Sequence, residues 1–187
     1  MLDPKKVTLY TGGHNGTEEY FGITAEKWGL TEVTFNFNGH DISRERGLKI
    51  LSDEELSRGG VGPDIIKKRL ERDFAHTPFM QKIFQVQFHI VNNGYQVFAC
   101  GWLLSNGTVK GGTGWAVELA KLFNRPVHLF EQDRKEWVSW IHNEWVTEEE
   151  PVICHKTIAV TGTRYLNAEG MQAIDELFER SFRTKDK

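Results

Sequence analysis

The sequence has few cysteines and no long hydrophobic run. Only two cysteines occur among 187 residues, and neither belongs to a CxxC pair or to a Cys/His cluster with zinc-ligand spacing. We therefore predict two free thiols, Cys100 and Cys154, and neither a structural metal nor another cofactor. No stretch approaches the roughly 20 apolar residues of a membrane-spanning helix, and Met1 to Lys6 lack the apolar core of a signal peptide. We expect a cytoplasmic protein that does not bind membranes.

An excess of positive charge is also absent. The formal net charge of -3 gives no electrostatic basis for binding nucleic acid, so any anionic ligand must be held by local groups. A content of 39% hydrophobic and 26% charged residues is typical of a globular protein. We expect one domain over residues 1–187, in which residues 148–156 form an exposed connection to the last strand and helix.

Short apolar runs alternate with helical patterns along the chain. Predicted strands cover residues 7–11, 31–37, 95–100, 126–130 and 157–161, and predicted helices cover 17–28, 64–75, 79–91, 116–123 and 168–182. Thr17, Ser52 and Asn167 are the predicted helix caps, and Met171 is expected on the core face of the last helix. The alternation predicts an α/β fold of Rossmann-like type, with three layers and a parallel sheet.

Two segments are harder to assign. The polar stretch 38–63 contains a short helical pattern at 53–56, and it is either a lid over a binding site or a solvated excursion. Residues 137–141 indicate a small edge strand or hairpin. The positive charges at 67–69 and Arg72 are interpreted as the solvated face of a helix.

A glycine-rich turn follows the predicted strand 95–100. Gly111, Gly112, Thr113 and Gly114 precede a helical pattern, and glycines at such a turn let the backbone approach an anion closely. The free N–H groups and the dipole of the first helical turn attract the same anion. The turn therefore indicates a phosphate site or, equally, a tight connection without a ligand.

Two further strands end in glycine-bearing turns, at Gly12-Gly13 and at Gly162-Thr163-Arg164. In a parallel sheet such turns emerge at one edge, where open α/β sheets bind their ligands. Arg164 suits bidentate contact with a phosphate. The carboxylates of Glu18 and Glu19 would repel a phosphate placed at the start of their own helix, and they are better suited to bind ribose hydroxyls. Convergence of three turns favours a nucleotide-type site, and His14 and His40, at strand ends, are candidates for ligand contact.

These motifs resemble the SLOG superfamily, a Rossmann-like group that includes the Lonely Guy phosphoribohydrolases and the DNA-processing protein A family. Residues 111–118 match the Lonely Guy pattern GGxGTxxE at both first glycines, the third glycine and the glutamate. Residues 12–18 are similar to the GGAxGAD turn, with Glu18 in place of aspartate. Residues 158–164 resemble the VxGxR strand that usually comes first, which implies a permuted strand order, completed within one protomer or by exchange in a dimer.

The resemblance implies a nucleotide-derived ligand: a nucleoside monophosphate, or an ADP-ribose-like or cyclic nucleotide signal. The chain then acts as a sensor or, if it belongs to a phage, as a sponge that sequesters a defence signal. The predicted ligand-binding residues come from the three turns and their surroundings: Gly12, Gly13, His14, Asn15, Gly16, Glu18, Lys82, Gly101, Trp102, Gly111, Gly112, Thr113, Gly114, Trp115, Gly162, Thr163 and Arg164.

The alternative is a phosphoribohydrolase that cleaves the N-glycosidic bond of a nucleoside 5′-monophosphate. Glu118 is its catalytic candidate, because a carboxylate there would stabilise an oxocarbenium-like ribosyl centre; the other interpretation is a charge that satisfies the helix dipole. Two departures from the Lonely Guy pattern weigh against catalysis. Only Lys82 stands where that family has an Arg-Lys pair, and Trp115 replaces the motif threonine.

A third interpretation concerns partners of the same chain. Trp137, Trp140 and Trp145 form either a contact surface or a part of the monomer core. Because members of the SLOG superfamily often dimerise near the site, we expect a homo-oligomer.

Overall fold

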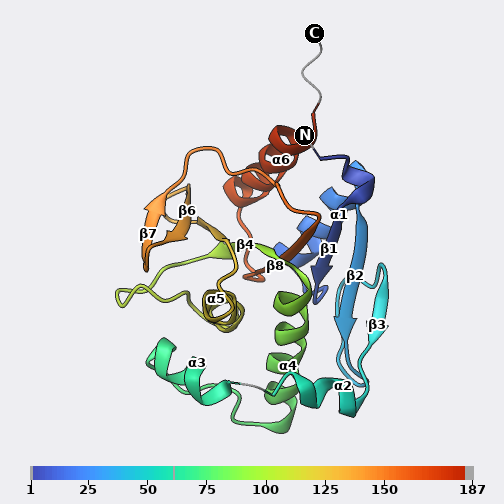
Figure 1. The fold of residues 1–187 in the computed structure, drawn as a ribbon, viewed down its shortest axis with the longest axis vertical. Helices are drawn as coiled ribbons and strands as arrows, with labels where there is room; N and C mark the ends of the chain where they lie inside the picture. Colours follow the sequence, from blue (N-terminus) through green and yellow to red (C-terminus); the bar gives the residue numbers. More distant parts are fainter. Residues whose placement is uncertain (1, 61, 184–187) are drawn as a thin grey trace.

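The computed structural model describes residues 2–60 and 62–183. Its eight described strands form one sheet in the order β3-β2-β1-β8-β4-β5-β6-β7 (Figure 1). The six strands from β3 to β5 are parallel, and β6 and β7 add an antiparallel hairpin at one edge. The strands are β1 (Thr8–Thr11), β2 (Thr31–Asn36), β3 (Leu48–Ile50), β4 (Gln96–Gly101), β5 (Val127–Glu131), β6 (Glu136–Ile141), β7 (Glu144–Thr147) and β8 (Thr157–Gly162).

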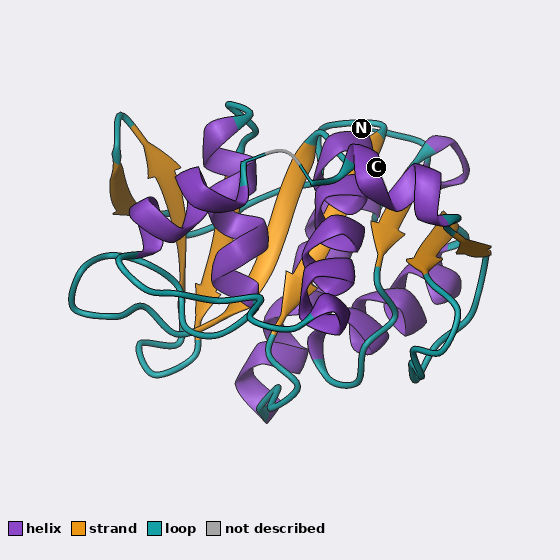
Figure 2. Cartoon of the chain, turned by 90° about the horizontal axis from the view of Figure 1, so that it is seen from below, coloured by secondary structure: helices purple, strands orange, loops and turns teal. Residues whose placement is uncertain are grey.

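Helices cover both faces of the sheet (Figure 2). After a short 3-10 turn, η1 (Pro4–Lys6), they are α1 (Thr17–Trp28), α2 (Asp53–Arg58), α3 (Pro63–Leu70), α4 (Pro78–Asn93), α5 (Thr113–Leu122) and α6 (Ala168–Phe182). The predicted α/β fold with three layers and a mostly parallel sheet is therefore confirmed. No helix in the described part of the chain combines the length and hydrophobicity that crossing a membrane requires.

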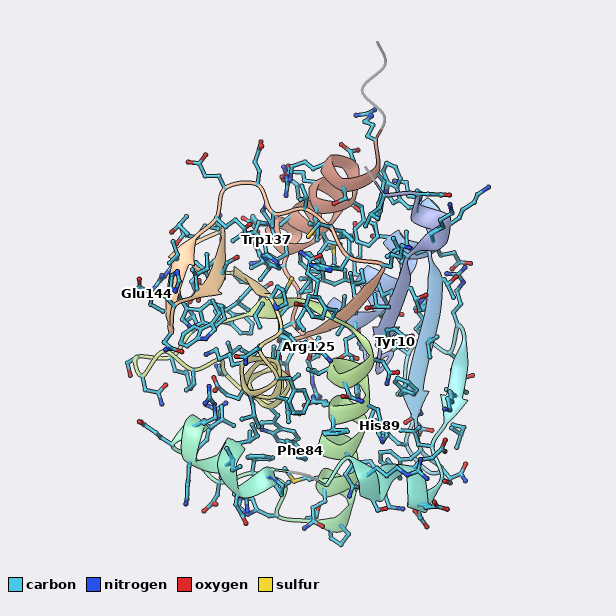
Figure 3. All side chains as sticks on the ribbon, viewed as in Figure 1. Tyr10, Phe84, His89, Arg125, Trp137 and Glu144 are labelled. Carbon is cyan, nitrogen blue, oxygen red and sulfur yellow. The ribbon has the colours of Figure 1, made fainter. Side chains whose placement is uncertain are left out.

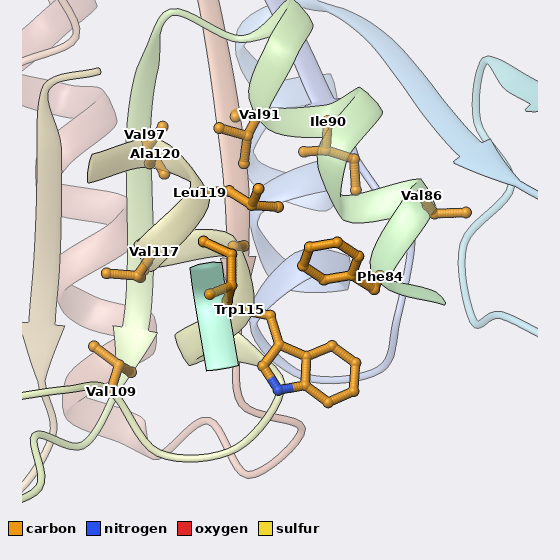
Figure 4. Close-up of a cluster of buried hydrophobic side chains, with 14 of the residues drawn as sticks. Phe84, Val86, Ile90, Val91, Val97, Val109, Trp115, Val117, Leu119 and Ala120 are labelled. Carbon is orange, nitrogen blue, oxygen red and sulfur yellow. The ribbon is translucent and has the colours of Figure 1, made fainter. Parts of the chain in front are cut away.

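Alternation along the central strands builds a core on each side of the sheet. On β8, Ile158 and Val160 pack with α1 and α6, whereas Ala159 packs with α4 and α5. Figure 4 shows the second core, in which Phe84 and Ile90 of α4 lie opposite Leu119 of α5. On the side of α4 that faces β2, His89 lies 6.0 Å from the ring of Phe35 and its Nε2 lies 2.7 Å from the Glu55 carbonyl oxygen (Figure 3).

The last strand lies in the middle of the sheet. β8 pairs in parallel with β1, where Ile158 is opposite Leu9, and with β4, where Ala159 is opposite Val97. This strand order is completed within one chain. It places the carboxyl ends of β1, β8 and β4 side by side, where the connections leave the sheet in opposite directions. This is the switch point at which open α/β sheets bind ligands.

Several local predictions are corrected. Thr17 does not cap α1: Gly16 is the N-cap, and the Thr17 hydroxyl donates to the Thr163 carbonyl. The helix predicted over 64–75 ends at Leu70, because Glu71 adopts the left-handed φ of 55°. Met171 is exposed rather than buried. Ser52 and Asn167 do cap their helices.

The predicted hairpin at 137–141 is confirmed as β6 and β7, and its tryptophans pack against other parts of the chain. Trp137, labelled in Figure 3, is buried with the α6 core, while Trp140 and Trp145 pack around the Lys121 ammonium. Trp137 therefore belongs to the monomer core, and Trp140 and Trp145 are partly buried against the other core. Both cysteines are free thiols, and burial raises the pKa of Cys100.

Candidate functional site

A cavity of about 580 Å³ opens where β1, β8 and β4 end. A second cavity of about 400 Å³ adjoins it and shares His14, Asn15, His40 and Arg164. All three glycine-bearing turns contribute to the walls of the larger cavity. The convergence predicted from the sequence is therefore present in the fold.

The structure brings together most of the predicted ligand-binding residues. Those that line the larger cavity are His14, Asn15, Glu18, Trp102, Gly111, Gly112, Thr113, Trp115, Gly162, Thr163 and Arg164. Those outside its lining are Gly12, Gly13, Gly16, Lys82, Gly101 and Gly114. The Lys82 ammonium instead lies 2.8 Å from the Asp53 carboxylate.

Two of the predicted glycines, Gly16 outside the lining and Gly162 within it, have a packing role. A Cβ on Gly16, whose φ is 88°, would lie 2.6 Å from the backbone of Arg164, and a Cβ on Gly162 would lie 2.5 Å from the Thr17 side chain. The Thr17 backbone N–H also donates to the Thr163 carbonyl at 3.1 Å. The absence of side chains at these two glycines thus lets the β1 and β8 turns touch and fixes Arg164 relative to α1.

The start of α1 carries a buried carboxylate on the cavity wall. Glu18 is 3% exposed and accepts hydrogen bonds from the backbone N–H of His14 and, at 2.7 Å, from its Nδ1. The negative charge of Glu18 raises the pKa of His14, against the lowering effect of burial. Because Glu18 occupies this helix terminus, an anion is not expected directly on α1. Burial lowers the pKa of the neighbouring His40, whose ring centroid lies 5.1 Å from that of His14.

The turn before α5 is held by an arginine that the sequence analysis assigned to a solvated face. The Arg72 guanidinium donates to the Thr108 hydroxyl and to the carbonyls of Val109 and Gly111, at 3.3, 2.6 and 3.2 Å. Burial lowers the pKa of Arg72. Gly112 then serves as the N-cap of α5 and offers no side chain to cap it. The turn is thereby fixed with its backbone toward the cavity.

Two cations on the cavity wall have no acidic partner among the described residues. They are Lys110, whose ammonium lies 5.6 Å from the Trp102 ring centroid, and Arg164 of the β8 turn. Exposed Tyr165 and the partly buried Trp102 complete this rim, and the Trp102 indole N–H donates to Asp133 at 3.0 Å. The rim therefore offers positive charge beside aromatic rings.

Another part of the wall comes from α4, from which the sequence analysis included only Lys82. Phe79, Ile83 and Gln87 follow one another at intervals of four residues and all line the cavity. Their spacing was readable from the sequence, but it also fits a core face. The lining residues missed by sequence reasoning are these three, Lys110 and Tyr165.

Glu118, the predicted catalytic candidate, does not line the cavity. One carboxylate oxygen lies 2.8 Å from the Arg69 Nε and the other lies 2.8 Å from the Lys121 ammonium. Both oxygens are thus held by cations, and Glu118 is 3% exposed. The geometry fits an internal ion pair between α3 and α5. Within the described residues no cluster of three or more His, Cys, Asp or Glu side chains is arranged to hold a metal ion.

Comparisons of the chain with protein-family models, with curated proteins and with solved structures gave no match. The resemblance to the SLOG superfamily therefore stays a prediction from the motifs.

Proposed function

We propose that the chain binds a nucleotide-derived ligand in the larger cavity and holds it without chemical change. The observation that carries this proposal is the place of Lys110 and Arg164, which have no acidic partner in the described part of the chain and lie beside aromatic rings at the switch point of a parallel sheet. Cations without acidic partners favour a phosphate, and aromatic rings favour a planar base. A volume of about 580 Å³ lies in the range of small-molecule sites.

The class of ligand is a nucleoside monophosphate or an ADP-ribose-like or cyclic nucleotide. Binding without turnover suits a sensor or a sponge for such a signal. The missing contact between Glu118 and the cavity supports this choice, because the carboxylate expected to assist hydrolysis is engaged elsewhere. We also propose a homo-oligomer, to be tested by light scattering at several concentrations.

Hydrolysis of the N-glycosidic bond remains the second candidate, and one observation favours it. Glu18 holds the Nδ1 of His14 at 2.7 Å on the cavity wall, an arrangement that leaves Nε2 to act as a general base. In that reaction His14 accepts a proton from the water whose oxygen bonds to C1′, while the C1′–N bond breaks and the leaving base takes up a proton from solvent. The catalytic pair is then His14 and Glu18 rather than Glu118.

One experiment separates the two candidates. The purified protein is denatured by heat and the released small molecules are identified by mass spectrometry, while a second sample is incubated with nucleoside monophosphates and ADP-ribose derivatives. Binding without turnover predicts that an intact nucleotide is recovered. Free base together with ribose phosphate would contradict it and support hydrolysis, provided that His14→Asn abolishes the release.

A matched pair of variants tests the role of the rim. Lys110→Gln combined with Arg164→Gln is expected to lower the affinity for phosphate-bearing ligands by at least about tenfold, since each charged contact contributes roughly 1.5–3 kcal/mol. Lys156→Gln removes an exposed positive charge outside the cavity and serves as control. Equal affinity in both variants would refute the assignment of the anion to this rim.

A further inference from the structure

Gln87 carries a buried side-chain oxygen that has no hydrogen-bond partner among the described residues. Gln87 is only 6% exposed and lines the larger cavity. The other described side-chain atom in this condition, Nε of Arg125, belongs to a residue outside that cavity. Because leaving a buried polar group unpaired costs stability, folded proteins retain few such groups, and each one calls for a specific explanation.

The surroundings of this amide are mostly apolar. Phe79 and Ile83 precede Gln87 on the same face of α4, and Trp115 faces the cavity from α5 with its ring stacked on Phe74 at 4.7 Å. Gln87 also lies beside the glycine turn, since its Nε2 is 3.9 Å from the position that a Cβ on Gly112 would occupy. The cavity thus offers one uncharged group with both a donor and an acceptor within an apolar wall.

This chemistry matches one part of a nucleotide better than the others. A phosphate is matched by the positive charges of Lys110 and Arg164, which lie on other elements. An amide among apolar side chains matches a flat, uncharged group whose edge carries N–H donors and N or O acceptors in one plane. A nucleobase has both properties, because its faces are apolar and its edge is polar.

We propose that Gln87 recognises the nucleobase of the bound ligand through its edge and determines which base the cavity accepts. This inference rests on the proposed function, since it specifies the ligand of the same cavity. A site that hydrogen-bonds a particular edge rejects ligands that lack it, because the buried amide then stays unpaired.

The test compares Gln87→Met and Gln87→Glu with the unaltered protein by titration calorimetry against AMP, GMP, CMP, UMP and ribose 5-phosphate. Gln87→Met keeps the length of the side chain and removes its hydrogen-bonding groups, whereas Gln87→Glu keeps the shape and replaces the donor. Gln81→Met, on an exposed position of α4 outside the cavity, is the control. We expect both Gln87 variants to change the ratio of affinities between the best and the worst base by at least about tenfold, with ribose 5-phosphate affected by less than about twofold.

A stability measurement accompanies the titration. Because Gln87→Met removes an unpaired buried polar group, its melting temperature without ligand should equal or exceed that of the unaltered protein. A folded Gln87→Met with unchanged preference among the bases would overturn the inference. An equal loss of affinity for all four nucleotides and for ribose 5-phosphate would also overturn the inference, because Gln87 would then contact the sugar phosphate. If the unaltered protein binds none of the five ligands and no ADP-ribose derivative or cyclic nucleotide, the proposed function fails as well, whereas binding with an unchanged base preference overturns this inference alone.

Discussion

Replacement of Glu118 by glutamine tests whether this residue belongs to the site or to the scaffold. Its carboxylate joins Arg69 and Lys121 at 2.8 Å each, and the Lys121 side chain is 3% exposed. The Lys121 ammonium also lies 3.6 Å from the ring centroid of Trp140 and 4.7 Å from that of Trp145. Burial lowers the pKa of Lys121, although its hydrogen bond to Glu118 favours the charged form.

The size of the effect follows from this burial. Removing one partner of a buried ion pair leaves an uncompensated charge and typically costs about 3–5 kcal/mol. In a chain of this length each 1 kcal/mol shifts the melting temperature by about 2–4 °C, so Glu118→Gln should melt roughly 10 °C lower. The affinity for a cavity ligand should change by less than about twofold, because Glu118 does not line the cavity.

The assay is thermal unfolding followed by circular dichroism, together with calorimetric titration of the ligand. The control is Glu54→Gln, which breaks an exposed pair with Arg58 and should cost no more than about 0.5 kcal/mol. An unchanged melting temperature combined with loss of binding or turnover in Glu118→Gln would refute the structural assignment and return this residue to the site.

Three further predictions concern the turns around the cavity. Gly16→Ala should lower both stability and ligand affinity, because its Cβ would clash with the Arg164 backbone. The control is Gly29→Ala, at a position that also has a positive φ but open space around it, and it should lower the free energy of unfolding by only about 1–2 kcal/mol and leave ligand affinity unchanged. Equal effects of the two substitutions in thermal melts and in ligand titrations would refute the argument. Because Glu18 raises the pKa of His14, His14 stays protonated somewhat above pH 6.5, and its contribution to stability is fully present below that pH. The affinity of the cavity for an anion should therefore fall as the pH rises through the raised pKa of His14. Ligand titrations above pH 7 whose pH dependence is as steep in His14→Asn as in the unaltered protein would contradict this. Arg72→Ala should free the backbone at residues 108–111, with faster amide hydrogen exchange there and weaker ligand binding, and exchange rates that stay the same would show that the turn does not depend on Arg72.

The sequence predicted those features that depend on local pattern. Apolar runs and glycine turns were sufficient to expect a mostly parallel sheet with helices on both faces. The place of β8 between β1 and β4 was not predicted, because the sequence pattern does not say which strands are neighbours. The gathering of three turns at one edge followed from the geometry of parallel strands.

Features that depend on contacts between distant residues were not predicted. Arg69 and Arg72 looked like solvated charges, yet they reach Glu118 and Val109, 49 and 37 residues away. Strand β3 is short and all three of its residues are exposed, so it has no alternating pattern to reveal it. Gln87 lies within an apolar helix face, and only the folded structure reveals that its side-chain oxygen is buried with no partner among the described residues.

The central claim is that the cavity between the β1, β8 and β4 turns binds a nucleotide through its positively charged rim. The most direct test is calorimetric titration of nucleoside monophosphates and ADP-ribose into protein freed of any copurified ligand, in parallel with the combined Lys110→Gln and Arg164→Gln variant. The account predicts saturable binding of at least one of these ligands to the unaltered protein and a loss of at least about tenfold in the variant. Absence of binding to the unaltered protein, or equal affinity in a folded variant, would contradict it.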